Sequence, residues 1–423
     1  MNLDLAVLRH TYHDLCAQIR ADPRAGLPTW TLDLQPGDLL TRPIICIASD
    51  NLELALEYLD HHANVVGIVN DFKVGTIYGR YRCISTAEMV ELHRRNPQTI
   101  LVNSTTAEAA QRHFNRVASQ NEISTLSLLQ LYRAFRLVDS IRVPIRPNGL
   151  LEVHDPLAFF DAALDLEVEH SRIEIGLEGT HSKVTLYGLL LQRLTGDSGW
   201  HVDVSVGNCM KPFGPDSYIV NSRFFEFSDS EVYVDAGAYR GETVELFANS
   251  VKNLFKKIHA FEPDPVNFAY LKAFCLDRFG MDQQRVQCHR AGVWEKSGKL
   301  RMFSTDSGDG PRIASHLELI DTTLESVDAT EEVDVVALDE HLADERVTFV
   351  KLEIEGSEVA ALRGARRLIV DNRPKLALSA YHRARDLVDL FEVVESFDAG
   401  YRIDLAHHRE GLSAMVYYCV PPR

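Results

Sequence analysis

The sequence contains no apolar run that approaches the length of a membrane-spanning helix, which takes about 20 residues. Its N-terminal stretch, MNLDLAVLRHTYHDL, carries acidic side chains early and lacks the apolar core of a signal peptide. The seven cysteines are scattered and never occur as CxxC, which argues against a cysteine zinc site and is typical of reduced thiols. We therefore expect a cytoplasmic protein without a membrane span.

Basic side chains are also scarce relative to acidic ones. The chain has 44 Lys and Arg against 61 Asp and Glu, a formal net charge of −17. Such an excess of negative charge argues against nonspecific nucleic-acid binding and against docking on anionic lipid. The hydrophobic content of 45% is ample for ordinary cores, and 423 residues suggest two or three domains.

The first half of the chain is predicted to be a helical lead-in at 1–41 followed by a Rossmann-like accessory domain at 42–145. Three apolar segments are predicted strands of this domain: 42–48, 65–69 and 99–103. Its first turn, IASDN (47–51), contains no glycine, so the dinucleotide fingerprint is absent. We favour a structural or dimerising domain, and hence a possible homo-oligomer, over a sugar-nucleotide site.

A connecting segment at 146–230 separates the two halves, after a proline- and glycine-containing linker. Residues 156–170 are predicted to form an acidic helix, whereas 185–194 fits either an apolar helix or a buried hairpin. We expect this segment, including 218–227, to pack against the domain that follows.

Residues 231–243, EVYVDAGAYRGET, combine a short apolar strand, a glycine turn and the start of a helix. Glycine lets the backbone approach a ligand closely, and the donors at a helix start face the same crevice. The pattern predicts a cofactor cradle, although a tight βα turn alone would look similar. Its predicted binding residues are Asp235, Gly237, Ala238, Gly241 and Thr243.

The next predicted strand, 258–262, ends in Glu262-Pro263-Asp264. An acid about 20 residues after a glycine loop can accept hydrogen bonds from ribose hydroxyls, and Glu262 follows Gly241 at that spacing. We expect Glu262, with Pro263 and Asp264, to bind a nucleoside; the alternative is a solvated glutamate at a strand end.

These motifs and three later ones resemble an S-adenosylmethionine-dependent methyltransferase of the FkbM type. The segments that carry the resemblance are VDAGAYRGET (234–243), KKIHAFEPDPVNF (256–268), FVKLEIEGSEVAALRGA (349–365), PKLALSAYHRARDL (374–387) and YRIDLAHH (401–408). The resemblance covers residues 231–423 and implies S-adenosylmethionine as cofactor.

The fold expected for 231–423 is α/β, with a doubly wound Rossmann-like sheet that binds ligands at the carboxyl ends of its strands. The predicted strands are 232–235, 258–262, 285–290, 347–353, 375–381, 401–405 and 414–420, with added strands at 299–303 and 333–338.

Methyl transfer to a hydroxyl needs a base, or a metal that lowers the hydroxyl pKa. In KLEIEGSE, strand alternation points Lys351, Glu353 and Glu355 the same way. The family usually has K-x-D-x-E-G-x-E, so Glu353 replaces the common Asp. His382 ends the next predicted strand and can titrate near neutral pH. We expect Glu353, Glu355 and His382 to be catalytic; a divalent metal is possible, with unknown ligands.

Four further residues are candidates for contact with the acceptor. His407 and His408 end a later strand and are second candidates for the base. Arg312 lies in TDSGDGPR (305–312), which fits either a lid over an anionic substrate or a solvated hairpin loop. Lys351 faces the same crevice on the predicted strand.

The leading hypothesis is an O-methyltransferase that acts on a sugar hydroxyl of a glycan or glycosylated metabolite. The alternatives are a methyltransferase of a non-sugar acceptor and a noncatalytic scaffold that retains a nucleoside-binding fold. A dehydrogenase is also conceivable, because a fold does not decide its function.

Overall fold

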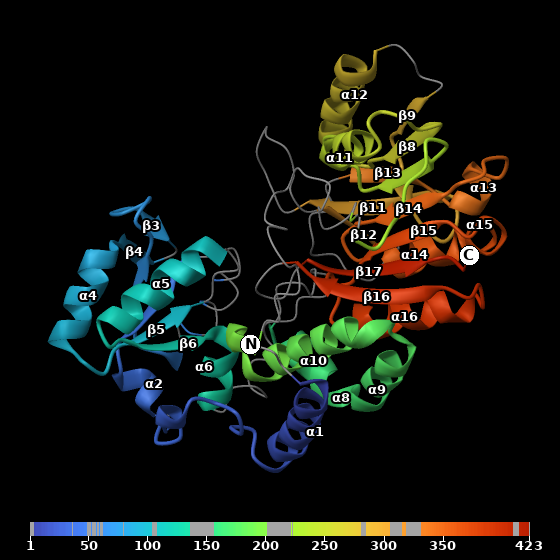
Figure 1. Ribbon diagram of the computed structural model, residues 1–423. Coiled ribbons are helices and arrows are strands. Elements are labelled where there is room, and N and C mark those ends of the chain that lie inside the picture. The colour runs from blue at the N-terminus through green and yellow to red at the C-terminus, as the bar shows by residue number, and fades with distance from the viewer. Residues whose placement is uncertain are drawn as a thin grey trace. The chain divides into compact units, whose positions relative to one another are not determined.

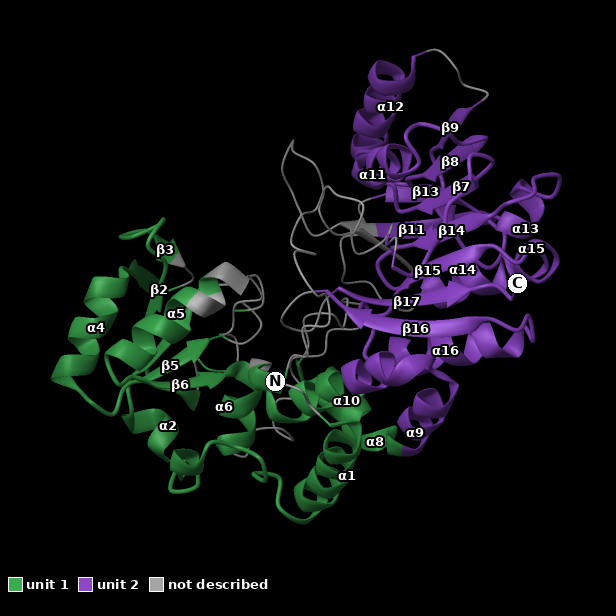
Figure 2. Cartoon of the chain, in the orientation of Figure 1, with its two compact units in different colours: residues 1–167, 187–202, 410–412 green, residues 168–186, 203–409, 413–423 purple. Residues whose placement is uncertain are grey.

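The computed structural model describes residues 4–35, 37–48, 52, 56, 59, 62–78, 80–103, 108–135, 156–200, 221, 223–280, 285–304, 315–318, 331–408 and 414–422. Two compact units make up the chain (Figure 2): residues 1–167, 187–202 and 410–412 form unit 1, and residues 168–186, 203–409 and 413–423 form unit 2. Within the described ranges, no helix has the length and apolar character needed to cross a bilayer.

Unit 1 contains a six-stranded sheet with the order β3-β4-β2-β1-β5-β6. Its strands are β1 (Ile44–Ile47), β2 (Val65–Val69), β3 (Ile77–Tyr78), β4 (Tyr81–Ile84), β5 (Ile100–Asn103) and β6 (Ser124–Ser127). Only the pairing of β3 with β4 is antiparallel among these strand pairs. The strands predicted at 42–48, 65–69 and 99–103 are confirmed as β1, β2 and β5.

Within this half of the chain, the helix at Thr86–Arg95 begins at a well-formed cap. Ser85 accepts from the Glu88 N–H at 3.1 Å while Glu88 accepts from the Ser85 N–H at 2.9 Å, a reciprocal cap that fixes the start of α4. The helices are α1 (Leu5–Ala21), α2 (Asp38–Thr41), α4 (Thr86–Arg95), α5 (Glu108–Gln120), α6 (Leu128–Ala134), α8 (Pro156–Asp165), α9 (Glu167–Gly176) and α10 (Gly179–Thr195), with 3-10 turns η1 (Thr29–Thr31) and η3 (Ser198–Trp200). The ambiguous segment 185–194 is helical.

Unit 2 is built on a seven-stranded sheet with the order β16-β17-β15-β14-β7-β8-β9 (Figure 1). Its strands are β7 (Val232–Ala236), β8 (Lys257–Phe261), β9 (Val286–His289), β14 (Phe349–Leu352), β15 (Lys375–Ser379), β16 (Arg402–His407) and β17 (Met415–Val420). Because β17 alone runs antiparallel to its neighbours, the other six strands present their carboxyl ends at one edge. The predicted doubly wound α/β fold is confirmed.

The helices of unit 2 are α11 (Glu242–Ser250), α12 (Pro265–Phe279), α13 (Leu338–His341), α14 (Glu358–Arg363), α15 (Arg366–Asn372) and α16 (Asp386–Ser396). A second sheet has the order β10-β13-β11-β12, with β10 (Gly292–Val293), β11 (Gly298–Ser304), β12 (Ser315–Glu318) and β13 (Glu331–Val336). The added strands predicted at 299–303 and 333–338 are therefore present as β11 and β13.

An aromatic core fixes the first strand of unit 2 against its neighbour. Tyr233 on β7 stacks on Phe349 on β14, with ring centroids 4.8 Å apart, and both side chains are fully buried. Phe225, from the segment 218–227, packs edge-on against Phe349, with ring centroids 5.4 Å apart. The described part of that segment thus packs against this domain, as expected.

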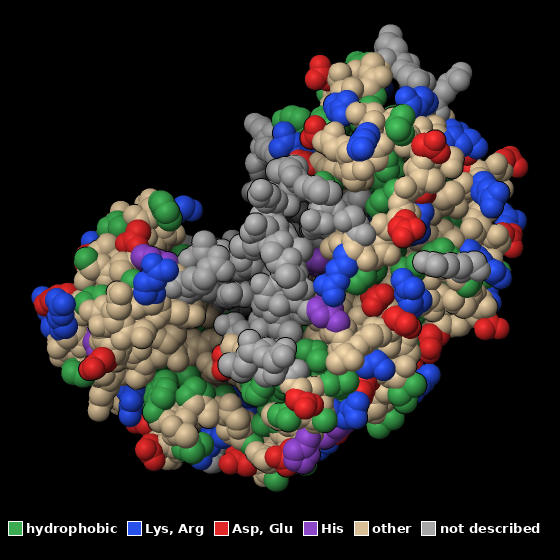
Figure 3. Space-filling view, in the orientation of Figure 1, with side chains coloured by type: hydrophobic (Ala, Val, Ile, Leu, Met, Phe, Trp, Pro, Cys, Tyr) green, Lys and Arg blue, Asp and Glu red, His purple; other side chains and the backbone are tan. Residues whose placement is uncertain are grey.

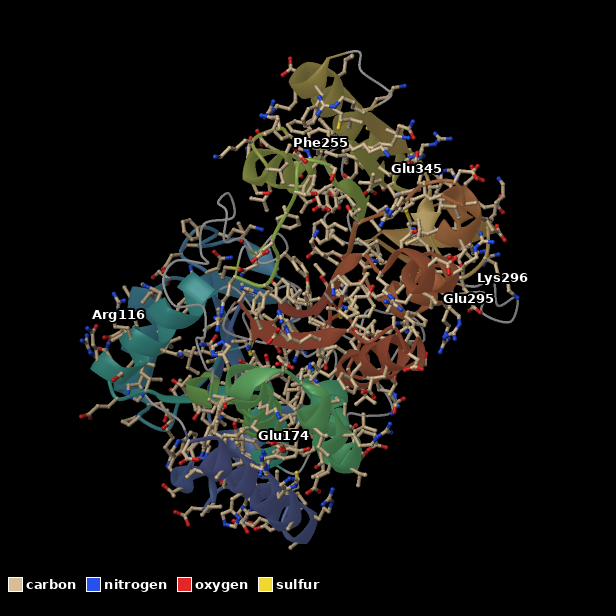
Figure 4. All side chains as sticks on the ribbon, turned by 45° about the vertical axis from the view of Figure 1, so that its right-hand side comes forward. Arg116, Glu174, Phe255, Glu295, Lys296 and Glu345 are labelled. Carbon is tan, nitrogen blue, oxygen red and sulfur yellow. The ribbon has the colours of Figure 1, made fainter. Side chains whose placement is uncertain are left out.

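A row of three histidines crosses β8, β9 and α13. His259 Nδ1 lies 3.1 Å from His289 Nε2, and His289 Nδ1 lies 3.2 Å from His341 Nε2. Burial lowers the pKa of His259 to about 4 and that of His289 to about 3, and it also lowers the pKa of His341. Glu345, labelled in Figure 4, lies 3.8 Å from His259 Nε2 at the inner end of the row. The row is neutral at neutral pH.

We expect acidification to destabilise the fold through this histidine row. Each folded-state pKa lies below the value of about 6.5 in the unfolded chain, so the unfolded state binds more protons as the pH falls below about 6.5. One such proton is worth up to about 1.4 kcal/mol per pH unit. Between about pH 7 and about pH 5, denaturant midpoints should therefore fall more steeply for the wild type than for His289→Gln. The His10→Gln variant, changed at an exposed helical position, should follow the wild type. Equal slopes for all three proteins would contradict the neutral row.

Candidate active site

The turn after β7 contains three residues with left-handed backbone angles. Gly237 has φ +76°, Tyr239 +49° and Gly241 +104°. A Cβ at Gly237 would lie 1.9 Å from the carbonyl oxygen of Glu353, and one at Gly241 would lie 2.3 Å from the ring of Phe274. Glycine is therefore required at both positions because other parts of the same chain lie against them. The sequence pattern suggested a ligand as the reason and did not reveal these contacts.

The N–H groups of this turn are already engaged within the protein. Those of Gly237 and Ala238 donate to the Phe261 carbonyl oxygen, and that of Gly241 donates to Ala238. The Tyr239 N–H donates to Glu262, and the next N–H donates to a carboxylate of α11. The N–H groups of residues 237–241 thus stabilise the turn itself.

A buried ion pair joins the carboxyl ends of β7 and β14. Lys351 Nζ lies 3.0 Å from Asp235 Oδ1, and both side chains are fully buried. Lys351 also donates to the carbonyl oxygens of Ala236 (3.1 Å) and Gly237 (2.6 Å), while Thr243 Oγ1 donates to Asp235 Oδ2 at 2.6 Å. The carbonyl oxygens and the two charged groups therefore hold the first part of the turn in place.

These contacts change the role expected for Lys351. Burial acts to lower the pKa of Lys351, but the charges of Asp235 and Glu353 outweigh it and raise the pKa. With a fully buried ammonium that already has three close oxygen partners, Lys351 has no surface for the predicted substrate contact. We therefore assign Lys351 to the support of the turn.

Glu262, at the end of β8, connects the turn to the start of α12. Its Oε2 accepts from the Tyr239 N–H and its Oε1 from the Asp264 N–H, each at 3.0 Å. The side chain is 6% exposed, and burial raises the pKa of Glu262 to about 8. Each carboxylate oxygen has two lone pairs, so Glu262 keeps acceptor capacity for a ligand.

The neighbouring Asp264 has a structural role that competes with cofactor contact. Its Oδ1 accepts from the N–H groups of Val266 (2.9 Å) and Asn267 (3.0 Å), and its side chain is fully buried. It is the N-cap of α12, ahead of a proline at the first helical position. Asp264 therefore caps α12, and its role in cofactor binding stays a prediction, as does that of Pro263, which is partly exposed.

Two partly exposed carboxylates follow β14. Glu353 Oε1 accepts from the Tyr381 hydroxyl at 2.8 Å, and its Oε2 lies 3.7 Å from Lys351 Nζ. Glu355 has φ +53°, and burial raises the pKa of its carboxyl to about 7. The side chains of Glu353 and Glu355 are 18% and 28% exposed, so both carboxylates reach the surface at the end of the strand.

His382 is buried between two carboxylates, those of Glu358 and Glu355. Its Nδ1 lies 2.9 Å from Glu358 Oε1 and its Nε2 lies 3.7 Å from Glu355 Oε2, with 2% of the side chain exposed. Burial alone would lower the pKa of His382, but Glu358 and then Glu355 raise it to about 10. This pKa lies above the near-neutral range that the sequence suggested for His382, and it favours the imidazolium form of the ring.

Glu358, His382 and Asp386 form a buried group whose ligand atoms lie within 4.8 Å of one another. Among the described residues, it is the one group of three such side chains with a spacing that suits a metal ion. Burial raises the pKa of Asp386 to about 7, and Asp386 Oδ2 accepts from the Arg383 N–H at 2.7 Å. Because Glu358 already accepts from His382, we interpret the group as an ion-paired network. Glu358 and Asp386 were not among the predicted site residues. The sequence shows Glu358 as the second glutamate of EGSE and Asp386 four positions after His382.

The other predicted substrate residues lie apart from this group. His407 and His408 are 2% and 6% exposed, and His408 Nε2 lies 2.8 Å from the Tyr418 hydroxyl, within hydrogen-bond distance. They end β16, which is separated from β14 by β17 and β15, so the structure does not bring them to Glu353 and Glu355. Arg312 lies outside the described residues. On the visible face of unit 2, acidic and basic side chains are interspersed (Figure 3).

Residues 235–403 match the family model of the methyltransferase FkbM domain. Among solved structures, the methyltransferase FkbM from Methylobacillus flagellatus KT is similar over 98% of this chain and 100% of its own, with 24% identity and a TM-score of 0.76. An rRNA methylase from Streptococcus thermophilus covers 46% of this chain and 89% of its own (15% identity, TM-score 0.30). A methyltransferase from Streptococcus mutans, described as putative and solved with SAH, covers 48% of this chain and 94% of its own (10% identity, TM-score 0.29). No curated protein matches the chain.

Replacing Gly237 with alanine should destabilise the fold by about 3 kcal/mol or more, because the new Cβ meets a backbone oxygen at a left-handed residue. Denaturant unfolding measures the change. Gly298→Ala is the matched control, since a Cβ there meets no atom within 4 Å, and it should stay within about 1 kcal/mol of the wild type. A Gly237→Ala protein as stable as the control would show that β14 does not approach the turn this closely.

Proposed function

We propose that the chain transfers a methyl group from S-adenosylmethionine to a hydroxyl oxygen of a sugar, because residues 235–403 match the family model of the methyltransferase FkbM domain. The acceptor would be a glycan or a glycosylated metabolite. The observation that carries the proposal is the position of the family match, which spans the glycine turn, Glu262 and the two partly exposed carboxylates of β14.

The cofactor proposal rests on residues at the ends of β7 and β8. Glu262 would accept from the ribose hydroxyls with the lone pairs that its two N–H donors leave free. Gly237, Ala238, Gly241 and Thr243 shape the neighbouring turn. The bound cofactor would supply an activated methyl group, and the protein would hold it still and exclude water.

The acceptor hydroxyl must lose its proton as its oxygen forms the new bond to carbon. Glu355 is the base in this proposal, since its carboxylate is 28% exposed and its pKa is about 7, close to the value that suits a general base near neutral pH. Glu353, oriented by Tyr381, would accept a hydrogen bond from the same substrate. His382, predicted as the base, would instead be the cation beside Glu355.

Removal of the Glu262 carboxylate should weaken binding of S-adenosylmethionine and S-adenosylhomocysteine alike, because both share the ribose. Hydrogen bonds to charged groups are worth about 1.5–3 kcal/mol, so calorimetry above about pH 8, where Glu262 is ionised, should give affinities for Glu262→Ala at least about tenfold lower. Glu245→Ala, on the exposed side of α11, is the control and should bind like the wild type. If Glu262→Ala kept its affinity and lost only turnover, Glu262 would not be the ribose ligand. Binding of NAD in place of either ligand would favour a dehydrogenase.

Glu355→Gln keeps the shape of the side chain but removes the base. General-base catalysis is typically worth about 10²–10⁴-fold, so kcat should fall at least about a hundredfold with little change in cofactor affinity. Near-normal turnover in Glu355→Gln would move the base to Glu353. Turnover that stops in EDTA and returns with Mg²⁺ or Mn²⁺ would replace the general base with a divalent cation, as an alternative means of activating the hydroxyl.

A further inference from the structure

Glu358 has no role in the proposed chemistry, yet it joins two segments of the site. It is the first residue of α14 and is fully buried. Its Oε1 accepts from the Ile354 N–H at 2.8 Å and from His382 Nδ1 at 2.9 Å. One carboxylate oxygen thus connects the turn after β14 to the end of β15.

The turn that carries Glu355 needs such support. Glu355 is a non-glycine residue with φ +53°, a strained conformation that persists only where the surroundings impose it. On the amino-terminal side of Glu355, the Ile354 N–H donates to Glu358. On the other side, the Gly356 carbonyl oxygen accepts from Arg383 Nε at 2.8 Å. Glu358 therefore fixes the amino-terminal side of the turn, and Arg383 fixes the other side.

The charge of Glu358 acts on Glu355 through His382. The buried imidazolium lies between the two carboxylates, at 2.9 Å from Glu358 and 3.7 Å from Glu355. A buried cation persists where a buried anion pairs with it. If Glu358 were neutral, His382 would lose its closest anionic partner, and Glu355 would then lose the cation that faces it.

We propose that Glu358 is a positioning residue of the active site: its carboxylate holds the Glu355 turn and keeps His382 charged, so that the carboxylate of Glu355 faces the imidazolium. This inference rests on the proposed role of Glu355 as the base. Other ionisable groups act on this pair as well: Lys351 and Glu353 act on Glu355, Asp386 acts on His382, and Arg383 acts on Asp386.

The test compares Glu358→Gln with the wild type, because glutamine keeps an oxygen that can accept from Ile354 and His382 but carries no charge. We expect kcat to fall at least tenfold, while the Kd for S-adenosylhomocysteine stays within twofold of the wild type. The rise of kcat with pH should move upward by at least half a pH unit, because His382 favours the ionised form of Glu355 more than Glu358 opposes it. Glu392→Gln, an exposed position on α16, is the control and should match the wild type in kcat and pH profile.

A second measurement does not depend on turnover. In protein labelled with ¹⁵N-histidine, His382 should be doubly protonated at pH 8 in the wild type and neutral in Glu358→Gln. Glu358→Asp keeps the charge and should retain the imidazolium, which gives a second variant if Glu358→Gln fails to fold. A neutral His382 in the wild type, or an unchanged kcat and pH profile in Glu358→Gln, would overturn the proposal. Absence of methyl transfer in the wild type, with the imidazolium present, would instead refute the proposed function and leave the ion pair standing.

Discussion

The buried ion pair between Lys351 and Asp235 is the interaction on which the rest of the site depends. It joins adjacent parallel strands at their carboxyl ends, and Lys351 also holds the carbonyl oxygens of Ala236 and Gly237. Loss of one partner from a buried pair typically costs about 3–5 kcal/mol, because the other charge is left without compensation. With β7 and β14 held together in this way, the Glu353 carbonyl oxygen reaches Gly237 and only glycine fits there.

The ionisable groups at the ends of β7, β8 and β14 differ in exposure, whereas Glu358 and His382 beyond them are buried. Lys351 and Asp235 are fully buried, Glu262 is 6% exposed, and Glu355 is 28% exposed. The innermost pair compensates its own charge, whereas burial without a full partner raises the pKa of both Glu262 and Glu355 towards neutrality. Such carboxyls are suited to bind or accept protons at working pH, which is a property of groups in functional sites more often than of structural ones.

Sequence patterns predicted what depends on local order and missed what depends on packing between distant segments. Apolar runs located the strands, and the spacing of Gly241 and Glu262 placed both at one edge, because the carboxyl ends of parallel strands share it. Nothing in KLEIEGSE indicates that Lys351 points into a closed space, since alternation gives the face of a strand but not what covers it. His382 was predicted as a base that titrates near neutral pH for a similar reason: its ion pair with Glu358, 24 residues earlier, cannot be seen in the local sequence.

The most direct test of the central claim is incubation of the full chain with methyl-labelled S-adenosylmethionine and a panel of glycans, followed by mass-spectrometric mapping of the products. The account predicts one labelled methyl group on a sugar oxygen, formed together with S-adenosylhomocysteine. A label on a non-sugar acceptor would keep the methyltransferase and change its substrate class. The contradicting result is tight cofactor binding with no methyl transfer, either to the glycan panel or to extracts that contain other acceptors. That result would favour a noncatalytic nucleoside-binding scaffold.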